Sequence, residues 1–213
     1  MDKLTSPGRL RAMTALLLLA PATPMLFQGQ EFAASSPFLF FADHHPGLAR
    51  LVAGGRKGFL SQFKSLSCPE SEPLLDDPGS EQTLLKCRLN SAERERHSHI
   101  YVLHKDLIQL RKTDPVFSHP HAGCVDGAVL APEAFVLRFF TEIEQDRLLL
   151  INLGVDLVLP SAAEPLIAPV EGRSWKIIWS SESPKYGGRG SGHVNIIDAV
   201  HLPGHAAFVM ATL

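Results

Sequence analysis

Two glutamines and a glutamate stand together directly after a short apolar run near the N-terminus. The run is residues 24–27, and Gln28, Gln30 and Glu31 follow it around Gly29. Amide side chains donate and accept hydrogen bonds, and a carboxylate accepts them, so this set suits the hydroxyl groups of a sugar. Because side chains alternate along an extended chain, we expect only one of the three to point into a cleft. Glu31 has two interpretations: it bonds a sugar hydroxyl, or it is a structural carboxylate that pairs with an arginine.

A second candidate group begins seven residues after Glu31. Phe38, Phe40 and Phe41 either offer an apolar platform for a sugar ring or seal a packed surface, and we expect Phe38 to be the exposed one. Asp43-His44 either bonds sugar hydroxyls or caps the helix that follows. The substrate-binding candidates are therefore Gln28, Gln30, Glu31, Phe38, Asp43 and His44.

The composition excludes several function classes. The 213 residues carry a formal charge of -2, and lysine and arginine form no basic stripe, so nucleic acid is not an expected partner. Cys68, Cys87 and Cys124 are too few and too dispersed for a disulfide framework, which favours a reducing, cytoplasmic setting. The motif His119-Pro120-His121 near Cys124 lacks a second ligand pair at zinc-site spacing, so we interpret it as a polar turn. We expect no metal and no cofactor.

The elements that position the candidate residues begin with a helix. Ser6-Pro7 is a good N-cap followed by proline in the first turn, which predicts a helix over residues 7–20. Residues 24–28 are predicted to form one buried strand. An alternative remains open, because Lys3, Arg9 and Arg11 before the apolar stretch resemble a secretory signal peptide. That stretch is too short to span a membrane.

Two further helices are expected in the middle of the chain. Apolar residues between positions 45 and 64 recur at helical spacing, and Gly54-Gly55 is expected to break or fray that helix. Residues 65–90 are rich in proline, serine and acids and are interpreted as a surface excursion. A capped helix is predicted from Ser91 to about Lys112, with Ile100, Leu103, Leu107 and Leu110 on one buried stripe. Asp114-Pro115 ends it.

Short strands are predicted after residue 115. They cover residues 134–141, 147–152, 155–159, 175–180, 194–199 and 206–211, separated by glycine and proline turns. This pattern indicates an antiparallel β-sandwich over residues 116–213, after a first domain over residues 1–115. Trp175 and Trp179 fall on one face of their strand by parity, and we favour core packing for them over glucan binding.

Residues 6–44 resemble the eighth-strand region of α-amylase-type glycoside hydrolases, above all maltooligosyltrehalose trehalohydrolases and next glycogen branching enzymes. The matching motifs are residues 23–32, 34–38 and 40–44, with weaker matches at 86–89, 106–112 and 202–206. The resemblance implies an α+β chain: the C-terminal end of a (β/α)8 barrel, then an antiparallel β-sandwich domain. It also implies a retaining hydrolase that cuts the α-1,4 bond beside a terminal trehalose and releases trehalose.

The resemblance also implies what this chain does not supply. The family's catalytic carboxylates follow barrel strands four, five and seven, and no segment here matches them, so no catalytic residue is assigned. We therefore expect a C-terminal portion of such an enzyme that is inactive alone, with a missing N-terminal barrel half as its partner and trehalose-capped glucan as the substrate of the whole. Bare apolar surface at residues 16–19 and 25–27 predicts that residues 1–60 are loosely held. A secreted glucan-binding β-sandwich module and a scaffold protein are the alternatives; no membrane partner is expected.

Overall fold

The computed structural model describes residues 4–64, 75–119, 123–142, 145–160, 164–190, 194, 196 and 199–212. The chain divides into two compact units, each described here by itself. One consists of Met1–Ala33 with Arg94–Leu213, and the other of Ala34–Glu93. The predicted domain division at residue 115 stays a prediction.

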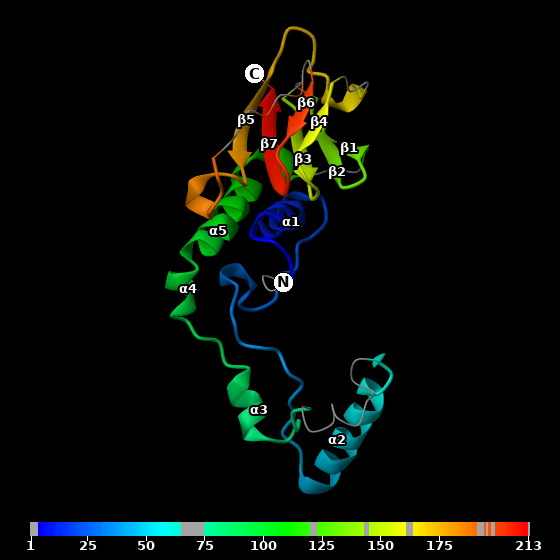
Figure 1. Ribbon diagram of the computed structural model, residues 1–213, viewed down its shortest axis with the longest axis vertical. Helices are drawn as coiled ribbons and strands as arrows, with labels where there is room; N and C mark the ends of the chain where they lie inside the picture. Colours follow the sequence, from blue (N-terminus) through cyan, green and yellow to red (C-terminus); the bar gives the residue numbers. More distant parts are fainter. Residues whose placement is uncertain are drawn as a thin grey trace. The chain divides into compact units, whose positions relative to one another are not determined.

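The first unit is built on a five-stranded antiparallel sheet in the order β1-β2-β3-β7-β5 (Figure 1). Two short strands, β4 and β6, form a separate antiparallel pair. The bounds are β1 Val125–Ala131, β2 Ala134–Phe139, β3 Arg147–Asn152, β4 Leu157–Leu159, β5 Trp175–Ser180, β6 Val200–Leu202 and β7 Ala206–Thr212. The predicted antiparallel β domain is therefore present, with one large and one small sheet.

Alternation of side chains along the central strands divides the core into two clusters. Leu149 and Val209 point to one face of the sheet, where they pack with helices α1 Pro7–Leu19 and α5 Ser98–Thr113. Leu150 and Phe208 point to the other face, toward β4 and β6. Both central strands are buried on both faces, so β3 and β7 are almost continuously apolar.

Helix α1 lies in the core of this unit. Ser6 caps it by accepting a hydrogen bond from the backbone of Arg9, and Pro7 starts it, as predicted. Ala12 and Ala15 are fully buried, and Leu18 is 1% exposed. The expectation that residues 1–60 are loosely held is therefore wrong for α1, because the β-sheet covers the apolar face that we expected to be bare.

The segment after α1 differs from its prediction. Residues 24–28 form no strand, and a single-turn helix, η1 Gln30–Phe32, follows them. A strand exists only with a hydrogen-bonded neighbour, and the described residues offer none here. Met25 is 85% exposed and Phe27 is 51% exposed, so this part of the predicted bare apolar surface is confirmed.

Helix α5 begins later than the sequence predicts. The short helix α4 Glu93–Arg96 precedes it, His97 takes the N-cap position of α5, and α6 Pro115–Ser118 follows it. Leu103 and Leu107 are buried as predicted, and Asp114 ends α5 and caps α6 through its side chain. Two further single turns are η4 Pro165–Ile167 and η5 Pro184–Tyr186.

The described residues of the second unit include the helices α2 Pro46–Leu60 and α3 Glu81–Lys86. Helix α2 runs through Gly54 and Gly55 without a break, so the predicted fraying is wrong. Neither Asp43 nor His44 caps α2. The cap is His45, which accepts a hydrogen bond from the backbone of Leu48.

Some predictions fall on residues outside the described ranges. These include Cys68, residues 120–121 of the histidine motif, residues 65–74 of the excursion predicted over residues 65–90, and part of the strand predicted at 194–199. The nearby strand is β6, which begins at Val200. Within the described part of the chain, no helix is both long and apolar enough to cross a bilayer.

Candidate functional site

Glu31 is the one predicted site residue that lies in a pocket with other chemically active side chains of the first unit. The pocket has a volume of about 400 Å³ and lies between η1 and α5. Among the described residues, Glu31 is the only carboxylate that lines it. The other lining residues are Leu26, Arg94, Tyr101, His104, Lys105, Ile108, Gln109 and Lys112.

Two contacts hold η1 against the start of α5. Nδ1 of His97 lies 2.8 Å from the carbonyl oxygen of Phe32, which can only accept, so this nitrogen carries the proton. The guanidinium of Arg94 lies 5.6 Å from the ring centre of Phe32 and 5.2 Å from that of Tyr101. These cation–π contacts fix Arg94 beside Glu31 at the pocket wall.

His104 forms the buried polar part of the pocket lining. It is 2% exposed, and its Nδ1 donates to the carbonyl oxygen of Ile100 at 2.9 Å. Its Nε2 is therefore a bare acceptor, and it has no hydrogen-bond partner among the described residues. Burial lowers the pKa of His104, although the hydrogen bond to Ile100 and the charge of Glu31 act in the opposite direction.

The two predicted glutamines have local roles or none. The side-chain oxygen of Gln30 accepts a hydrogen bond from the backbone of Phe27 at 3.2 Å, which closes the turn around Gly29. Gln28 is exposed in that turn. Glu31 alone of the three lines this pocket. The expectation that only one of them points into a sugar-binding cleft stays a prediction.

Phe38, Asp43 and His44 lie in the second unit. Phe38 is 63% exposed, more than Phe40 at 44% and Phe41 at 38%, so the predicted exposure of Phe38 is confirmed. Its ring meets that of Phe41 edge to face. Asp43 lines a separate depression of about 300 Å³ near the start of α3, and His44 is exposed.

Sequence reasoning missed Arg94, Tyr101 and His104 as pocket residues. His104 follows Leu103 and lies four residues after Ile100, so a signal was present: one polar residue within the apolar stripe of α5. His119 and Cys124 line another pocket, of about 300 Å³, but no group of three metal-ligating side chains occurs in the described ranges.

Comparisons with known proteins identify the relatives of this chain. A family described as a domain of unknown function (DUF3459) matches residues 122–209. A malto-oligosyltrehalose trehalohydrolase of Deinococcus radiodurans is 41% identical over 145 residues, which cover 67% of this chain and 23% of that protein. The protein of the same name from Mycobacterium tuberculosis strain H37Rv is 32% identical over 184 residues, which cover 84% of this chain and 28% of that protein. The chain is similar to the C-terminal portion of malto-oligosyltrehalose trehalohydrolases.

Solved structures show the same fold. A crystal structure from Salmonella typhimurium, named as an alpha amylase, matches with a TM-score of 0.71 at 22% identity and covers 98% of this chain and 31% of that one. The trehalose-6-phosphate hydrolase of Bacillus licheniformis matches with a TM-score of 0.58 at 15% identity, and the match covers 99% of this chain and 40% of that one. This chain thus spans about a quarter of the length of the trehalohydrolase relatives and has the fold of the matching part of α-amylase-type enzymes.

Proposed function

We propose that this chain forms the C-terminal portion of a malto-oligosyltrehalose trehalohydrolase. The whole enzyme hydrolyses the α-1,4 bond next to a terminal trehalose unit and releases trehalose, with retention of configuration at the anomeric carbon. The observation that carries this proposal is the 41% identity over 145 residues to the Deinococcus radiodurans relative. Neither a metal nor another cofactor enters the proposed reaction.

Residues 24–27 form no strand in this chain; in this proposal they become the last strand of a (β/α)8 barrel only in the whole enzyme, where a neighbouring strand can pair with them. The helices α1 and α5 lie on either side of this segment in sequence. Support comes from their positions in one unit: α1 and α5 pack against each other, and Leu26 packs against the same cluster. Arg111 of α5 donates to the carbonyl oxygens of Leu18 and Ala20 at 2.7 and 2.8 Å. These bonds satisfy the C-terminal carbonyls of α1 and fix the start of the segment.

The predicted site residues then have binding roles and no catalytic role. A retaining glycosidase needs two carboxyl groups about 5–5.5 Å apart, one as nucleophile and one as acid and base. Glu31 is the only carboxylate that the described residues contribute to its pocket, so it is proposed to accept a hydrogen bond from a sugar or to orient a neighbouring side chain. Gln28 and Gln30 are proposed to border the sugar site of the first unit. Phe38, Asp43 and His44 are proposed, separately, as sugar-binding residues of the second unit.

Two proteins test this function. The first is the chain alone. The second is a chimera in which this chain replaces the matching C-terminal region of the Deinococcus radiodurans relative. We expect the chimera to release trehalose from maltotriosyltrehalose and the chain alone to release none. Release by the chain alone would disprove the proposed inactivity, and a folded chimera without activity would disprove the assignment to this reaction.

A further inference from the structure

The start of α3, in the second unit (Figure 1), borders a depression of about 300 Å³, called here the α3 depression. The ring of Phe41, together with Pro78 and Leu84, supplies apolar surface to its lining. Asp43 and Glu81 supply two carboxylates. An apolar concavity that also carries a few polar groups is the usual composition of a small-molecule site.

Hydrogen bonds join the two chain segments that form the depression. The backbone N–H of Ala42 donates to the carbonyl oxygen of Pro78 at 2.9 Å, which fixes residues 41–43 against the turn before α3. That turn is itself held, because the hydroxyl of Thr83 donates to the carbonyl oxygen of Asp77 at 2.6 Å. The depression is thus formed before any ligand binds, which lowers the entropic cost of binding.

The two carboxylates have no partner in the described ranges of the chain, where no hydrogen bond or ion pair involves Asp43 or Glu81. The nearby Asp76 differs, since Lys86 pairs with it. Phe41 is 38% exposed and Leu84 is 44% exposed. The depression therefore offers two hydrogen-bond acceptors beside accessible apolar surface.

This combination fits the surface of a glucose unit. A pyranose ring has an apolar face of C–H groups, which packs on an aromatic ring, and hydroxyl groups around its edge. An ionised carboxylate only accepts hydrogen bonds, so its ligand must donate them, as a hydroxyl group does. Phe41 lies between the two requirements, because Asp43 is two residues away and Glu81 lines the same depression.

We propose that the α3 depression binds one glucose unit of the trehalose-capped glucan, with Phe41 against the ring and with Asp43 and Glu81 accepting hydrogen bonds from its hydroxyl groups. This inference rests on the proposed function, which supplies the class of substrate. It adds Phe41 and Glu81 to the binding residues. Phe38 does not line the depression, and its ring meets that of Phe41 edge to face at 6.5 Å between centroids, so it supports the Phe41 ring.

A cation is the competing occupant for two carboxylates beside an aromatic ring. No group of three metal-ligating side chains occurs in the described part of the chain, whereas Ca²⁺ takes six to eight oxygen ligands. An ammonium group would leave the apolar surface of Pro78 and Leu84 uncovered. The observations favour the sugar, and the cation is an outcome of the test.

The experiment is an NMR titration of the isotope-labelled chain with maltotetraose, with trehalose, and with Ca²⁺ or lysine. We expect maltotetraose to shift the amide signals of residues 41–43 and 79–81. Phe41→Ala and Glu81→Ala should each raise the dissociation constant about tenfold, because one removes the apolar contact and the other a charged acceptor. Trehalose shows whether the bound unit comes instead from the trehalose end.

Two variants in the same unit serve as controls. Phe59→Ala removes an aromatic ring that is 52% exposed, and Gln82→Ala changes the residue next to Glu81, but neither position lines the depression. Both should leave the dissociation constant for maltotetraose unchanged. No binding of either sugar would overturn the proposal, and so would equal effects of the site and control variants. Signal shifts at residues 41–43 and 79–81 with Ca²⁺ or lysine alone would assign the depression to a cation instead.

The chimera separates this inference from the proposed activity. There, Phe41→Ala and Glu81→Ala should raise KM for maltotriosyltrehalose and leave kcat within about twofold, as expected for a contact made equally in ground and transition states. Trehalose release with an unchanged KM in both variants would overturn the glucose site and leave the reaction standing. Maltotetraose binding that both variants weaken, found together with a folded but inactive chimera, would leave the site standing and disprove the reaction.

Discussion

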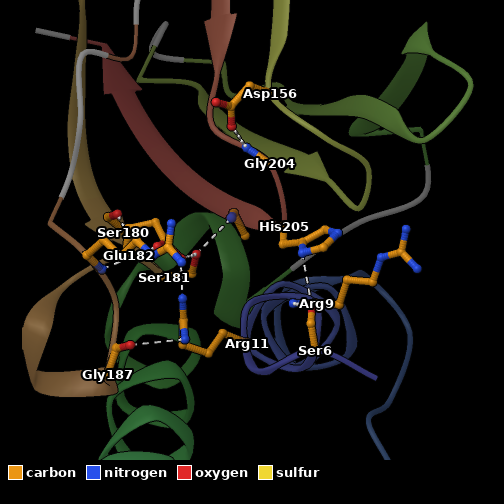
Figure 2. Close-up of polar contacts among 12 residues, drawn as sticks. Ser6, Arg9, Arg11, Asp156, Ser180, Ser181, Glu182, Gly187, Gly204 and His205 are labelled. Carbon is orange, nitrogen blue, oxygen red and sulfur yellow. Dashed lines mark hydrogen bonds and ion pairs between the residues drawn. The ribbon is translucent and has the colours of Figure 1, made fainter. Parts of the chain in front are cut away.

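Arg11 of α1 and Glu182, which follows β5, form a buried ion pair with 2.5 Å between Nη2 and Oε1 (Figure 2). The two residues are 8% and 7% exposed. Arg11 also donates to the carbonyl oxygen of Gly187 at 3.3 Å, and the Glu182 carboxylate accepts from the hydroxyl of Ser181 at 3.2 Å. This pair therefore connects the N-terminal helix to the β domain across 171 sequence positions.

Substitution Arg11→Met is expected to lower the free energy of unfolding by about 3–5 kcal/mol, because the Glu182 carboxylate stays buried without its partner. Urea denaturation followed by tryptophan fluorescence measures the change. The double variant Arg11→Met with Glu182→Leu should recover much of the loss, since both charges are then removed.

The control for this prediction is Glu133→Gln. Glu133 forms an ion pair with Arg9 at 2.9 Å, but its side chain is 57% exposed, so its loss should cost at most about 1 kcal/mol. A cost for Arg11→Met no larger than for Glu133→Gln would show that the buried pair does not hold α1 to the sheet.

Gly8 allows α1 to approach the turn before β7. A β-carbon at this position would lie 2.8 Å from both Cβ and the carbonyl oxygen of His205, the residue that also contacts the Ser6 hydroxyl (Figure 2). Gly8→Ala should therefore destabilise the chain by about 1–3 kcal/mol in thermal or urea unfolding, despite the better helix propensity of alanine.

Gly54→Ala in α2 is the matched control variant. Nothing lies within 4 Å of its added β-carbon, so it should raise helicity at 222 nm instead of lowering stability.

The two tryptophans of β5 show where sequence parity fails. Trp175 and Trp179 are four residues apart, which predicts one face, and both are buried as predicted. A β-bulge between Ile177 and Trp179 shifts the register against β7. Trp175 consequently packs in one core cluster and Trp179 in the other. A bulge adds a residue without changing the local composition, so alternation alone could not reveal it.

The start of α1 was predictable because its capping signal is local in sequence. The central strands were predictable because they are buried on both faces and are therefore continuous apolar runs. Ser6-Pro7 marks the start of α1, and the apolar runs give the central strand β3 with its observed bounds and the central strand β7 to within one residue. The strand predicted at residues 24–28 needs a partner strand, which its own residues cannot supply. The pocket around Glu31 was only partly predictable, because Arg94 and His104 approach it through the docking of η1 on α5, a contact distant in sequence.

Tyr186 joins η5 to α5 through its hydroxyl. The hydroxyl accepts from Nε1 of Trp179 at 3.1 Å and donates to the carboxylate of Asp106 at 2.8 Å, while Lys185 donates to the same carboxylate oxygen at 2.7 Å. Tyr186→Phe removes both hydrogen bonds of the hydroxyl and leaves the indole N–H buried and unpaired. The expected loss is about 1–3 kcal/mol in urea denaturation.

The contribution of Asp106 should depend on pH. Burial raises the pKa of Asp106, but the hydrogen bonds from Lys185 and Tyr186 and the lysine charges outweigh it, so the pKa is lowered overall. A lowered carboxyl pKa stabilises the fold above the unfolded value near 3.9, and the contribution disappears as pH falls through the folded value. The stability difference between the natural chain and Asp106→Asn should therefore be present at pH 6 and shrink below pH 4. A difference that stays constant from pH 6 to pH 3 would contradict this ion pair.

His104 should make the folded chain less stable in acid. Burial lowers its pKa from the ordinary value of 6.5, and this effect outweighs the hydrogen bond to Ile100 and the charge of Glu31, which both raise the pKa. The unfolded chain then binds a proton more readily than the folded chain, so the stability due to neutral His104 is present above pH 6.5 and declines as pH falls toward the folded pKa.

The substitution His104→Phe removes this pH-dependent contribution to stability. Urea denaturation from pH 7.5 to 5 measures the free energy of unfolding of both proteins. As pH falls, that of the natural chain should decrease relative to that of the variant. Glu31, Arg94, Lys105 and Lys112 line the same pocket as His104 and are present in both proteins, so their contributions cancel in the difference. A pH-independent difference would mean that the imidazole of His104 is protonated as easily in the folded chain as in water.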